Sequence, residues 1–497
     1  MGRRLSDILR RPVGDDDPEI AGVTADSRKV RPGFLFAALP GAAADGRAFV
    51  PQAVAAGAAA VLAPSGGPWG ALTAAVPVIR THDVKRAYAL AARAFWGGEP
   101  QTVVAVTGTN GKTSVATFCR QIFARCGRSA ASLGTLGLQL EGEDLTEPGL
   151  TTPDAGEVAR FAAELAERGV THLALEASSH GLDQRRLDGL TLKAAGFTNL
   201  TQDHLDYHQT MAAYREAKLR LFTTLMPRGG TAVLNADNDD FAAFAAASVM
   251  HGQTVMSVGE SGVGLRLLSR TPEPGGQRLR LAAEGREYDV LLPLAGAFQA
   301  SNVLVAAGLC IAAGEQVPAV LAALEQIRGA PGRLQRVGAG PKGGEAYVDY
   351  AHTPDGLVTV LKALRPHVSG RLIVVFGAGG DRDRAKRPLM GRAAAELADV
   401  AIVTDDNPRG EDPRDIRRAV LEGAPDALEV GDRRAAIRAA AEQLCEGDVL
   451  VVAGKGHEQG QTIAGVVHPF DDVTETRAAL EAIAGRDAIG QRAAPRD

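Results

Sequence analysis

Short apolar runs alternate with longer segments of helical periodicity along most of this chain. Runs such as TVVAVT at 102–107 are rich in Val and Ala, which is typical of strands buried on both faces of a parallel sheet. Helical segments between these runs predict an α/β fold with helices on both faces of its sheets. The predicted strands lie at 34–41, 59–65, 102–107, 172–178, 194–200, 231–237, 346–352, 371–380, 400–406 and 448–456.

The remaining periodic segments complete this pattern. Residues 48–58, 211–222, 301–314 and 317–327 are predicted helices. Residues 253–292 have hairpin character, which we interpret as an antiparallel addition at the edge of the central sheet.

Two breaks divide the strands and helices into three sets. The first is WGGEP at 96–100, and the second is GAPGR at 329–333. We therefore predict three α/β domains, and a length of 497 residues agrees with about 150 residues per domain. They are a small N-terminal domain at 1–98, a central parallel-sheet domain at 99–330 and a C-terminal Rossmann-like domain at 331–497.

Composition narrows the class of protein. A net charge of −5 argues against a nucleic-acid partner bound through a general basic field. The four cysteines form no C-x-x-C pair, which favours free thiols in a reducing compartment. The N-terminus lacks the apolar core of a signal peptide, and no run of about 18 apolar residues predicts a membrane span. We expect a cytoplasmic protein.

The candidate chemistry begins at VVAVTGTNGKTS, residues 103–114. A strand, a glycine-rich loop and a following helix are the context of a phosphate-binding loop, whose backbone N–H groups hold phosphate oxygens. Lys112 would neutralise the β- and γ-phosphates, and Thr113 would bind Mg²⁺ through its hydroxyl. Val106 stands where the usual pattern has its first Gly, which argues against a P-loop GTPase. A chance turn with a surface lysine is the alternative.

Two further residues are candidate metal ligands. Glu176 ends a predicted strand, and His204 lies in the segment QDHLDYH. The strand ends of a parallel sheet gather ligands, and Mg²⁺ prefers oxygen donors that a His can join. The alternative for Glu176 is a capping or structural carboxylate, and for His204 it is a structural histidine. For His180, a purely structural role and a functional role are equally expected.

The loop and a series of segments after it resemble the Mur ligase family, amide-forming enzymes of cell-wall precursor synthesis. The segments occur in the order expected for that family. They are TGTNGKTS (107–114), TTPD (151–154), EASSHGLDQRR (176–186), FTNLTQDHLDYH (197–208), YREAKLRLF (214–222), NADN (235–238), PGRLQRV (331–337), VDYAHTPDGL (348–357), GAGGDRDRAKRPLM (377–390), DDNPRGEDP (405–413) and GKGHEQGQ (454–461).

The resemblance implies a reaction. It implies an ADP-forming ligase that adds meso-2,6-diaminopimelate to UDP-N-acetylmuramoyl-L-alanyl-D-glutamate, with ATP and Mg²⁺ as cofactors. A carboxylate does not condense with an amine at neutral pH, so ATP would first convert it to an acyl phosphate. Because three highly charged reactants meet, cations are needed at the phosphates.

Lys218 lies in the middle of a predicted helix, where a solvated lysine is the ordinary interpretation. The resemblance implies instead that Lys218 is carbamylated and that its carbamate binds a second Mg²⁺. Carbamylation needs a neutral amine, so we expect a desolvated site that lowers the pKa of Lys218.

The resemblance also implies the nucleotide contacts. Asn302 begins a predicted helix, so helix capping is its alternative role. Arg333 lies in the predicted linker between domains, from which it could reach a phosphate on closure. The expected ATP-binding residues are Gly108, Thr109, Asn110, Gly111, Lys112, Thr113, Ser114, Asn302, Arg333, Asp349 and His352.

The UDP-dipeptide would be held by residues of the first two domains. The segments Asp26-Ser27-Arg28 and Gly41…Asp45-Gly46 resemble the family's uridine-diphosphate site, although ordinary helix caps and turns have the same residues. The expected contacts are Ser27, Asp45, Gly46, Thr151, Thr152, Ser178, Gln184 and Arg186.

The third domain would select the amino acid. Asp406-Asn407-Pro408-Arg409 matches the family's signature for diaminopimelate, whose distal carboxylate suits the bidentate fork of Arg409. Glu458 would favour the distal ammonium, and a structural turn is the alternative for the DNPR segment. The expected contacts are Arg382, Asp406, Asn407, Pro408, Arg409, Gly454 and Glu458.

Several alternatives stay open from the sequence. A relative that adds L-lysine would lack Arg409, and folylpolyglutamate synthesis would not need the UDP-type first domain. A nucleotide-binding regulatory protein would need the loop without Lys218, Glu176 and Arg409 together. We expect a monomer.

Overall fold

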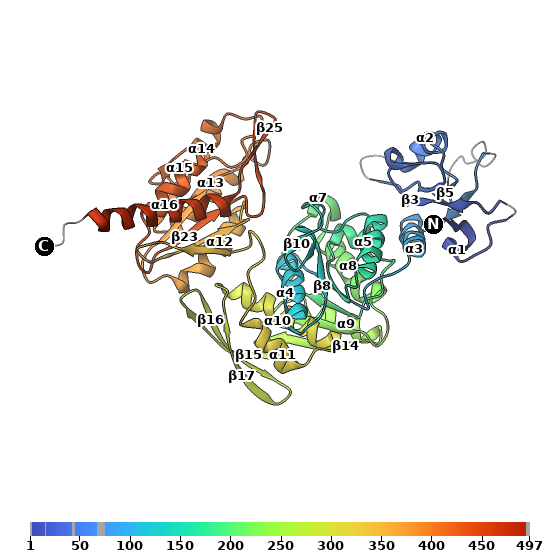
Figure 1. Ribbon diagram of the computed structural model, residues 1–497, viewed down its shortest axis with the longest axis horizontal. Helices are drawn as coiled ribbons and strands as arrows, with labels where there is room; N and C mark the ends of the chain where they lie inside the picture. Colours follow the sequence, from blue (N-terminus) through green and yellow to red (C-terminus); the bar gives the residue numbers. More distant parts are fainter. Residues whose placement is uncertain (1, 15, 42–44, 67–74, 494–497) are drawn as a thin grey trace. The chain divides into compact units, whose positions relative to one another are not determined.

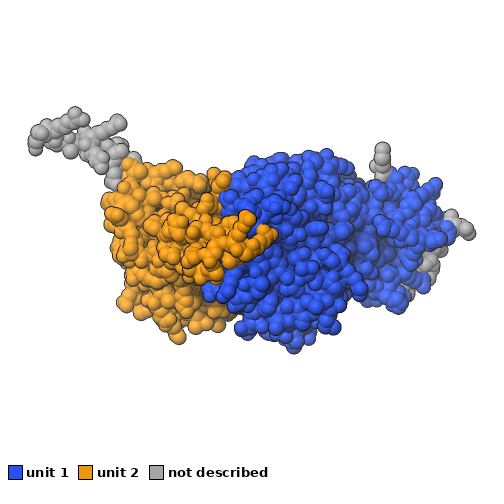
Figure 2. Space-filling model, turned by 90° about the horizontal axis from the view of Figure 1, so that it is seen from below, with its two compact units in different colours: residues 1–266, 304–323 blue, residues 267–303, 324–497 orange. Residues whose placement is uncertain are grey.

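The structure is a computed structural model. It describes residues 2–14, 16–41, 45–66 and 75–493, with side chains through residue 484. Figure 2 colours the two compact units into which the chain divides. The first unit comprises residues 1–266 and 304–323, and the second comprises residues 267–303 and 324–497. The predicted domain boundaries after residues 98 and 330 stay predictions.

The N-terminal part of the first unit contains a four-stranded parallel sheet in the order β3-β4-β5-β6 (Figure 1). One face of this sheet packs against helix α3, and the other packs against α2. The elements are β1 (Arg3–Arg4), α1 (Leu5–Leu9), β2 (Glu19–Ile20), β3 (Gly22–Thr24), η1 (Ser27–Lys29), β4 (Phe34–Ala37), η2 (Gly46–Phe49), α2 (Val50–Ala55), β5 (Ala60–Pro64), β6 (Val78–Thr81) and α3 (Val84–Trp96).

The central sheet is built around strand β7, which the sequence predicts at the same residues, 102–107. Its strand order is β10-β9-β8-β11-β7-β12-β13-β14-β15-β16-β17. The elements up to β13 are β7 (Thr102–Thr107), α4 (Lys112–Arg125), β8 (Ala130–Gly134), β9 (Gly137–Leu140), β10 (Glu143–Asp144), α5 (Ala155–Glu167), β11 (His172–Glu176), α6 (Ser179–Asp183), β12 (Ala194–Phe197), α7 (Leu205–His208), α8 (Met211–Arg220), η3 (Leu221–Leu225) and β13 (Thr231–Asn235).

The remaining elements of this region are α9 (Phe241–Met250), β14 (Thr254–Gly259), β15 (Leu265–Glu273), β16 (Gly276–Ala283), β17 (Arg286–Leu292), α10 (Ala297–Ala313) and α11 (Val317–Leu324). The expected antiparallel addition at residues 253–292 is confirmed in part and wrong in part. Strand β14 pairs parallel with β13 and β15 pairs parallel with β14, whereas β16 and β17 form an antiparallel hairpin. Local alternation identifies a strand but carries no information about the direction of its partner.

The strands β7, β8, β11, β12 and β13 pair in parallel and are buried on both faces. Alternate residues of β7 face opposite ways: Val103 and Ala105 belong to a core cluster with helix α5. Helix α10 covers β12, where Gly196 lies against Val305 and Leu309. The predicted parallel sheet with helices on both faces is confirmed.

The C-terminal sheet of the second unit has the order β18-β19-β23-β20-β21-β22, and all its pairs except β18–β19 are parallel. Val374 faces a core with helices α12–α14, and its neighbours Ile373 and Val375 face one with α15 and α16. The bounds are β18 (Gln335–Ala339), β19 (Glu345–Asp349), α12 (Pro354–Leu364), η4 (Arg365–His367), β20 (Leu372–Phe376), α13 (Lys386–Leu397), β21 (Val400–Val403), α14 (Pro413–Leu421), β22 (Leu428–Glu429), α15 (Arg433–Glu442), β23 (Val449–Ala453), β24 (Gly460–Ile463), β25 (Val466–Pro469) and α16 (Asp472–Ala493).

The structure thus has the predicted three α/β regions, and the C-terminal one is Rossmann-like. None of the helices in the described part of the chain is both long and apolar enough to cross a membrane.

Candidate active site

The glycine-rich loop joins β7 to α4, as the sequence predicts. Gly108 and Gly111 have φ of 153° and 90°, and a Cβ at Gly108 would lie 1.9 Å from Thr198 Oγ1. The loop therefore needs glycine at position 108 because a neighbouring segment approaches it closely. Val106 is buried within β7, so the position of the missing first Gly belongs to the strand.

The main chain of the loop is hydrogen-bonded to the segment after β12. Thr109 N donates to Asn199 O at 2.8 Å, and Asn110 N donates to Asn199 Oδ1 at 3.0 Å. Ser114 is buried in the first turn of α4. These bonds hold the loop on the carboxyl end of the central sheet, where ligands gather in open α/β folds.

Two lysines converge on one backbone carbonyl of the loop. Lys112 Nζ lies 2.9 Å from Gly108 O, and Lys218 Nζ lies 2.7 Å from the same oxygen. Lys218 is 1% exposed, so the interpretation as a solvated helix lysine is wrong. Burial, together with the nearby charge of Lys112, lowers the pKa of Lys218 well below its usual range. The neutral amine is the form that this environment favours.

A chain of hydrogen bonds leads from the loop helix to Thr151. Thr113 Oγ1 donates to Glu176 Oε2 at 2.9 Å, and Thr135 N donates to Glu176 Oε1 at 2.8 Å. The hydroxyls of Thr135 and Thr151 are 3.0 Å apart. Glu176 lies at the end of β11, and a Cβ on Gly134 would lie 2.0 Å from its Oε1. Glycine at position 134 therefore makes room for this carboxylate.

The predicted dipeptide residues continue this network. Thr152 Oγ1 donates to Glu176 O at 2.7 Å, and it accepts from Ser178 N and Ser178 Oγ at 3.0 Å. Arg186 reaches Thr152 O at 2.5 Å and Gln184 Oε1 at 2.7 Å. The structure therefore brings Thr151, Thr152, Ser178, Gln184 and Arg186 together with Glu176 and the phosphate loop.

His204 lies at the start of α7 in a cluster of aromatic rings. Its ring centroid is 4.8 Å from that of His180 and 6.2 Å from that of Tyr214. Its φ is 52°, a conformation that costs energy for a residue with a side chain. Lys218 Nζ lies 4.3 Å from the centroid of the same Tyr214 ring. His204 and Lys218 therefore flank one tyrosine.

The donors near the loop fit Mg²⁺. Thr113 and Glu176 supply a hydroxyl and a carboxylate side by side, which are the hard oxygen donors that Mg²⁺ prefers. Among the residues that the structure describes, no group of three or more His, Cys, Asp or Glu side chains could hold a metal ion.

The predicted uridine-diphosphate residues lie in short turns of the N-terminal region. Asp26 and Asp45 cap η1 and η2, and each also pairs with an arginine two residues later. Ser27 Oγ lies 3.4 Å from Gln52 Oε1. A Cβ on Gly46 would lie 2.5 Å from Leu39 O. The capping roles foreseen as the alternative are thus present at Asp26 and Asp45.

The remaining predicted nucleotide residues lie in the second unit. Asn302 is in the interior of α10, which begins at Ala297, so the predicted helix start at residue 301 and the capping alternative are wrong. The guanidinium of Arg333 lies 4.6 Å from the ring centroid of Tyr350. Asp349 accepts from Leu334 N and Ala351 N, and burial raises the pKa of Asp349 to about 6. His352 Nδ1 is 2.8 Å from Tyr350 O.

The predicted amino-acid residues meet at the carboxyl ends of β21 and β23. Arg409 has a φ of 53°, and its main chain bonds to the hairpin of β24 and β25 through Thr462 O and Ala464 N. Its Nη1 donates to Gly380 O at 2.9 Å. Asn407 Nδ2 donates to Glu458 Oε2 at 3.0 Å, so the DNPR segment is joined to the segment after β23.

Two other members of this predicted set are backbone features. Gly454 has a φ of 125°, and a Cβ there would lie 3.0 Å from Asp406 Oδ2. A Cβ on Gly380 would lie only 1.9 Å from Pro408 O. Arg382 is exposed in the segment before α13.

Sequence reasoning missed three side chains that the structure adds to these regions. Thr135 links Glu176 to Thr151, Tyr350 lies under Arg333, and Lys455 is buried beside Asn407. Lys455 follows Gly454 directly in GKGHE, so the motif held the signal, but a lysine there is ordinarily taken as solvated.

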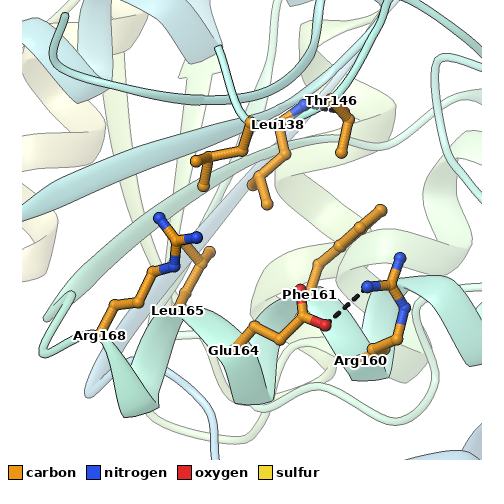
Figure 3. Close-up of a pocket in the computed structure, with 8 residues that line it drawn as sticks. Leu138, Thr146, Arg160, Phe161, Glu164, Leu165 and Arg168 are labelled. Atoms are coloured by element: carbon orange, nitrogen blue, oxygen red, sulfur yellow. Dashed lines mark hydrogen bonds and ion pairs between the residues drawn. The ribbon is translucent and has the colours of Figure 1, made fainter. Parts of the chain in front are cut away.

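A cavity of about 250 Å³ lies away from all these residues, between α5 and β9 (Figure 3). Leu138, Phe161 and Leu165 from the central core form its apolar wall, and Arg160 pairs with Glu164 at its edge. None of the predicted site residues lines this cavity. We interpret it as a packing gap at the edge of the sheet.

The fold and the loop define a three-domain α/β protein with a phosphate-loop motif. Family models described as "Mur ligase family, catalytic domain", "Mur ligase middle domain" and "Mur ligase, glutamate ligase domain" match residues 19–96, 106–310 and 332–456. The chain belongs to the Mur ligase family, and this membership makes it an enzyme of the ligase class.

Individual relatives match nearly the whole chain. A protein of Caulobacter vibrioides is 69% identical over 97% of this chain and 100% of its own, and one of Mesorhizobium japonicum is 52% identical over 93% and 95%. Both are named UDP-N-acetylmuramoyl-L-alanyl-D-glutamate–2,6-diaminopimelate ligase. A solved structure of a ligase with that name is 34% identical, with a TM-score of 0.74 over 97% of this chain and 99% of its own.

Proposed function

We propose that the chain is an ATP-dependent, ADP-forming ligase that adds meso-2,6-diaminopimelate to UDP-N-acetylmuramoyl-L-alanyl-D-glutamate. The names of its relatives support this substrate pair. The observation that carries the chemistry is the set of hydrogen bonds from Thr113, next to Lys112 in the loop, through Glu176 to Thr152. It joins a phosphate-binding loop to the residues that the family uses for the acceptor peptide.

The phosphate loop would bind ATP through its backbone N–H groups. Lys112 would turn from the carbonyls of Gly108 and Thr109 to the β- and γ-phosphates, because a phosphate is a stronger acceptor than a carbonyl. Asn302, Arg333, Asp349 and His352 are proposed as contacts to adenosine and phosphate from the second unit.

Lys218 would act as a carbamate. Its neutral amine attacks the carbon of CO₂, a C–N bond forms as one C=O π bond opens onto its oxygen, and the nitrogen loses one proton to water. The buried amine next to Lys112 supports this step because only an unprotonated nitrogen has the electron pair to attack. The product is an anion beside the loop, so it would attract a cation, which the neutral amine does not.

Thr113, Glu176 and His204 would hold Mg²⁺, and the Lys218 carbamate would hold a second Mg²⁺. Bound there, Mg²⁺ supplies positive charge that stabilises the phosphates during transfer. The pairing of Thr113 with Glu176 supports the first two as ligands, and the ring of Tyr214 shared by His204 and Lys218 supports the others.

The reaction would proceed in two steps. A carboxylate oxygen of the D-glutamyl residue attacks the γ-phosphorus, the bond to ADP breaks, and an acyl phosphate forms. The neutral amine of diaminopimelate then attacks the acyl carbon, phosphate leaves, and an amide remains. Arg186 is proposed to orient an anionic group of the UDP-dipeptide, and Ser27, Asp45 and Gly46 its uridine diphosphate.

The second unit would hold the amino acid. Arg409 offers a fork to the distal carboxylate of diaminopimelate, and Glu458 offers a carboxylate to its distal ammonium. Asp406, Asn407, Pro408, Arg382 and Gly454 complete the proposed set. We also propose a cytoplasmic location, because the proposed substrates are soluble nucleotides and amino acids, and we propose that the enzyme is a monomer.

The test is a ligase assay with purified protein, ATP, MgCl₂, the UDP-dipeptide and meso-diaminopimelate. We expect phosphate release that requires both the UDP-dipeptide and the amino acid. Phosphate release when the UDP-dipeptide or the amino acid is left out would overturn the proposed function. So would the lack of phosphate release when both are present.

A further inference from the structure

A buried lysine that the proposed mechanism does not use lies beside the amino-acid site. Lys455 follows β23, and its side chain is 0% exposed. Its Nζ donates to Asn407 Oδ1 at 2.9 Å and lies 3.6 Å from both Asp406 Oδ1 and Glu458 Oε2. A lysine is rarely buried unless anions and acceptors hold it, so these contacts define its place.

Lys455 fixes the orientation of the Asn407 amide. Asn407 Oδ1 accepts from Lys455 Nζ and also from Thr462 N, both at 2.9 Å. Because two donors meet on that atom, the opposite side of the amide must be Nδ2, which donates to Glu458 Oε2 at 3.0 Å. Hydrogen bonds therefore connect Lys455 through the Asn407 amide to Glu458.

The positive charge of Lys455 is directed at two carboxylates, those of Asp406 and Glu458. Arg433, the neighbouring buried cation, forms a bidentate pair with Asp472, and both side chains are 0% exposed. Asp406 Oδ1 is buried and accepts no hydrogen bond from the described residues. Among the described ion pairs, the cation that balances its negative charge is Lys455. One ammonium thus faces two carboxylates.

We propose that Lys455 is a positioning residue that sets the site's preference for a distal end carrying both an ammonium and a carboxylate. The inference rests on the proposed function and deepens it. With Lys455 present, the negative charges of Asp406 and Glu458 are partly neutralised. The site then tolerates the distal carboxylate of the substrate beside Arg409. Without Lys455, the site gains one negative charge, repels that carboxylate and favours the bare ammonium of L-lysine.

The test compares the wild type with Lys455→Met, which removes the charge and keeps the length of the side chain. We expect the KM for meso-diaminopimelate to rise about tenfold while the KM for ATP stays within about twofold, and L-lysine to become a stronger inhibitor. Lys362→Met is the matched control, because Lys362 is exposed on α12 and should leave both KM values unchanged.

A purely structural role gives a different result. It would raise both KM values together, and that outcome overturns the inference, as does an unchanged KM for diaminopimelate. If Lys455→Met does not fold, Lys455→Gln keeps a donor toward Asn407 Oδ1, and the same split between the two KM values is expected. Failure of the wild type to form the amide would instead overturn the proposed function, and the inference with it.

Discussion

In the phosphate loop of the first unit, the charged side chains bond to the main chain. Lys112 and Lys218 both reach the carbonyl of Gly108. In the proposed amino-acid site of the second unit, Lys455 bonds instead to the side chain of Asn407, and Asn407 bonds to the side chain of Glu458. The first arrangement depends on backbone shape, whereas the second depends on complementary charges from distant segments.

This difference separates the two tasks that the enzyme is proposed to perform. A site that handles phosphate needs a fixed cradle of N–H groups, and one contiguous strand–loop–helix segment supplies it. A site that distinguishes two amino acids needs opposed charges at set distances. These come from separate segments of the chain, such as those of Asp406 and Lys455, whose Oδ1 and Nζ lie 3.6 Å apart. Substitutions should therefore affect chemistry in one region and selectivity or stability in the other.

The largest effect is expected at the loop. Lys112→Met should lower kcat by about a thousandfold or more, because the cation at the transferred phosphoryl group is lost. The measurement is steady-state phosphate release, and Lys193→Met, at an exposed position before β12, is the control. A Lys112→Met enzyme with near-normal kcat would remove the loop from the chemistry.

The buried ion pair of the second unit should respond in stability. Asp472→Asn leaves Arg433 buried without its counter-charge, so the free energy of unfolding should fall by about 3–5 kcal/mol. Denaturant unfolding measures this change. Glu475 lies on α16, as Asp472 does, and Glu475→Gln breaks its partly exposed pair with Arg434 of α15, which should cost less than about 1 kcal/mol. Equal losses would show that burial does not distinguish the two pairs.

The specificity site should respond in kcat/KM. Arg409→Lys should lower kcat/KM for meso-diaminopimelate by about tenfold to a hundredfold, since a lysine cannot make the bidentate bond to a carboxylate. The ATP KM serves as the internal reference and should change little. If the ATP KM rises in parallel, the contrast between the two regions is lost.

The smallest effect concerns the pH dependence of stability. The pKa of Lys218 is lowered in the folded protein, so between that value and about 10.5 the unfolded state binds the extra proton. Stability should therefore rise with pH across this window, by up to about 1.4 kcal/mol per pH unit more in the wild type than in Lys218→Met. Denaturant unfolding at several pH values in CO₂-free buffer measures both slopes. Parallel slopes would contradict a buried neutral amine.

Sequence patterns were sufficient for the elements that carry their own signal. The strand at 102–107 and the loop after it follow from contiguous residues, and the structure has the strand at the same positions. The parallel direction of β14 and the start of α10 at Ala297 were missed, because both depend on packing partners far along the chain. Lys455 was missed for the same reason: the groups that make its burial tolerable lie on other segments.

The most direct measurement of the central claim is a competition reaction analysed by mass spectrometry. Purified enzyme, ATP, MgCl₂ and UDP-N-acetylmuramoyl-L-alanyl-D-glutamate are mixed with equal concentrations of meso-diaminopimelate and L-lysine. The account predicts a UDP-tripeptide that contains diaminopimelate in large excess over lysine, with one ADP formed per amide. Equal incorporation of the two amino acids, or ADP without any amide, would contradict it.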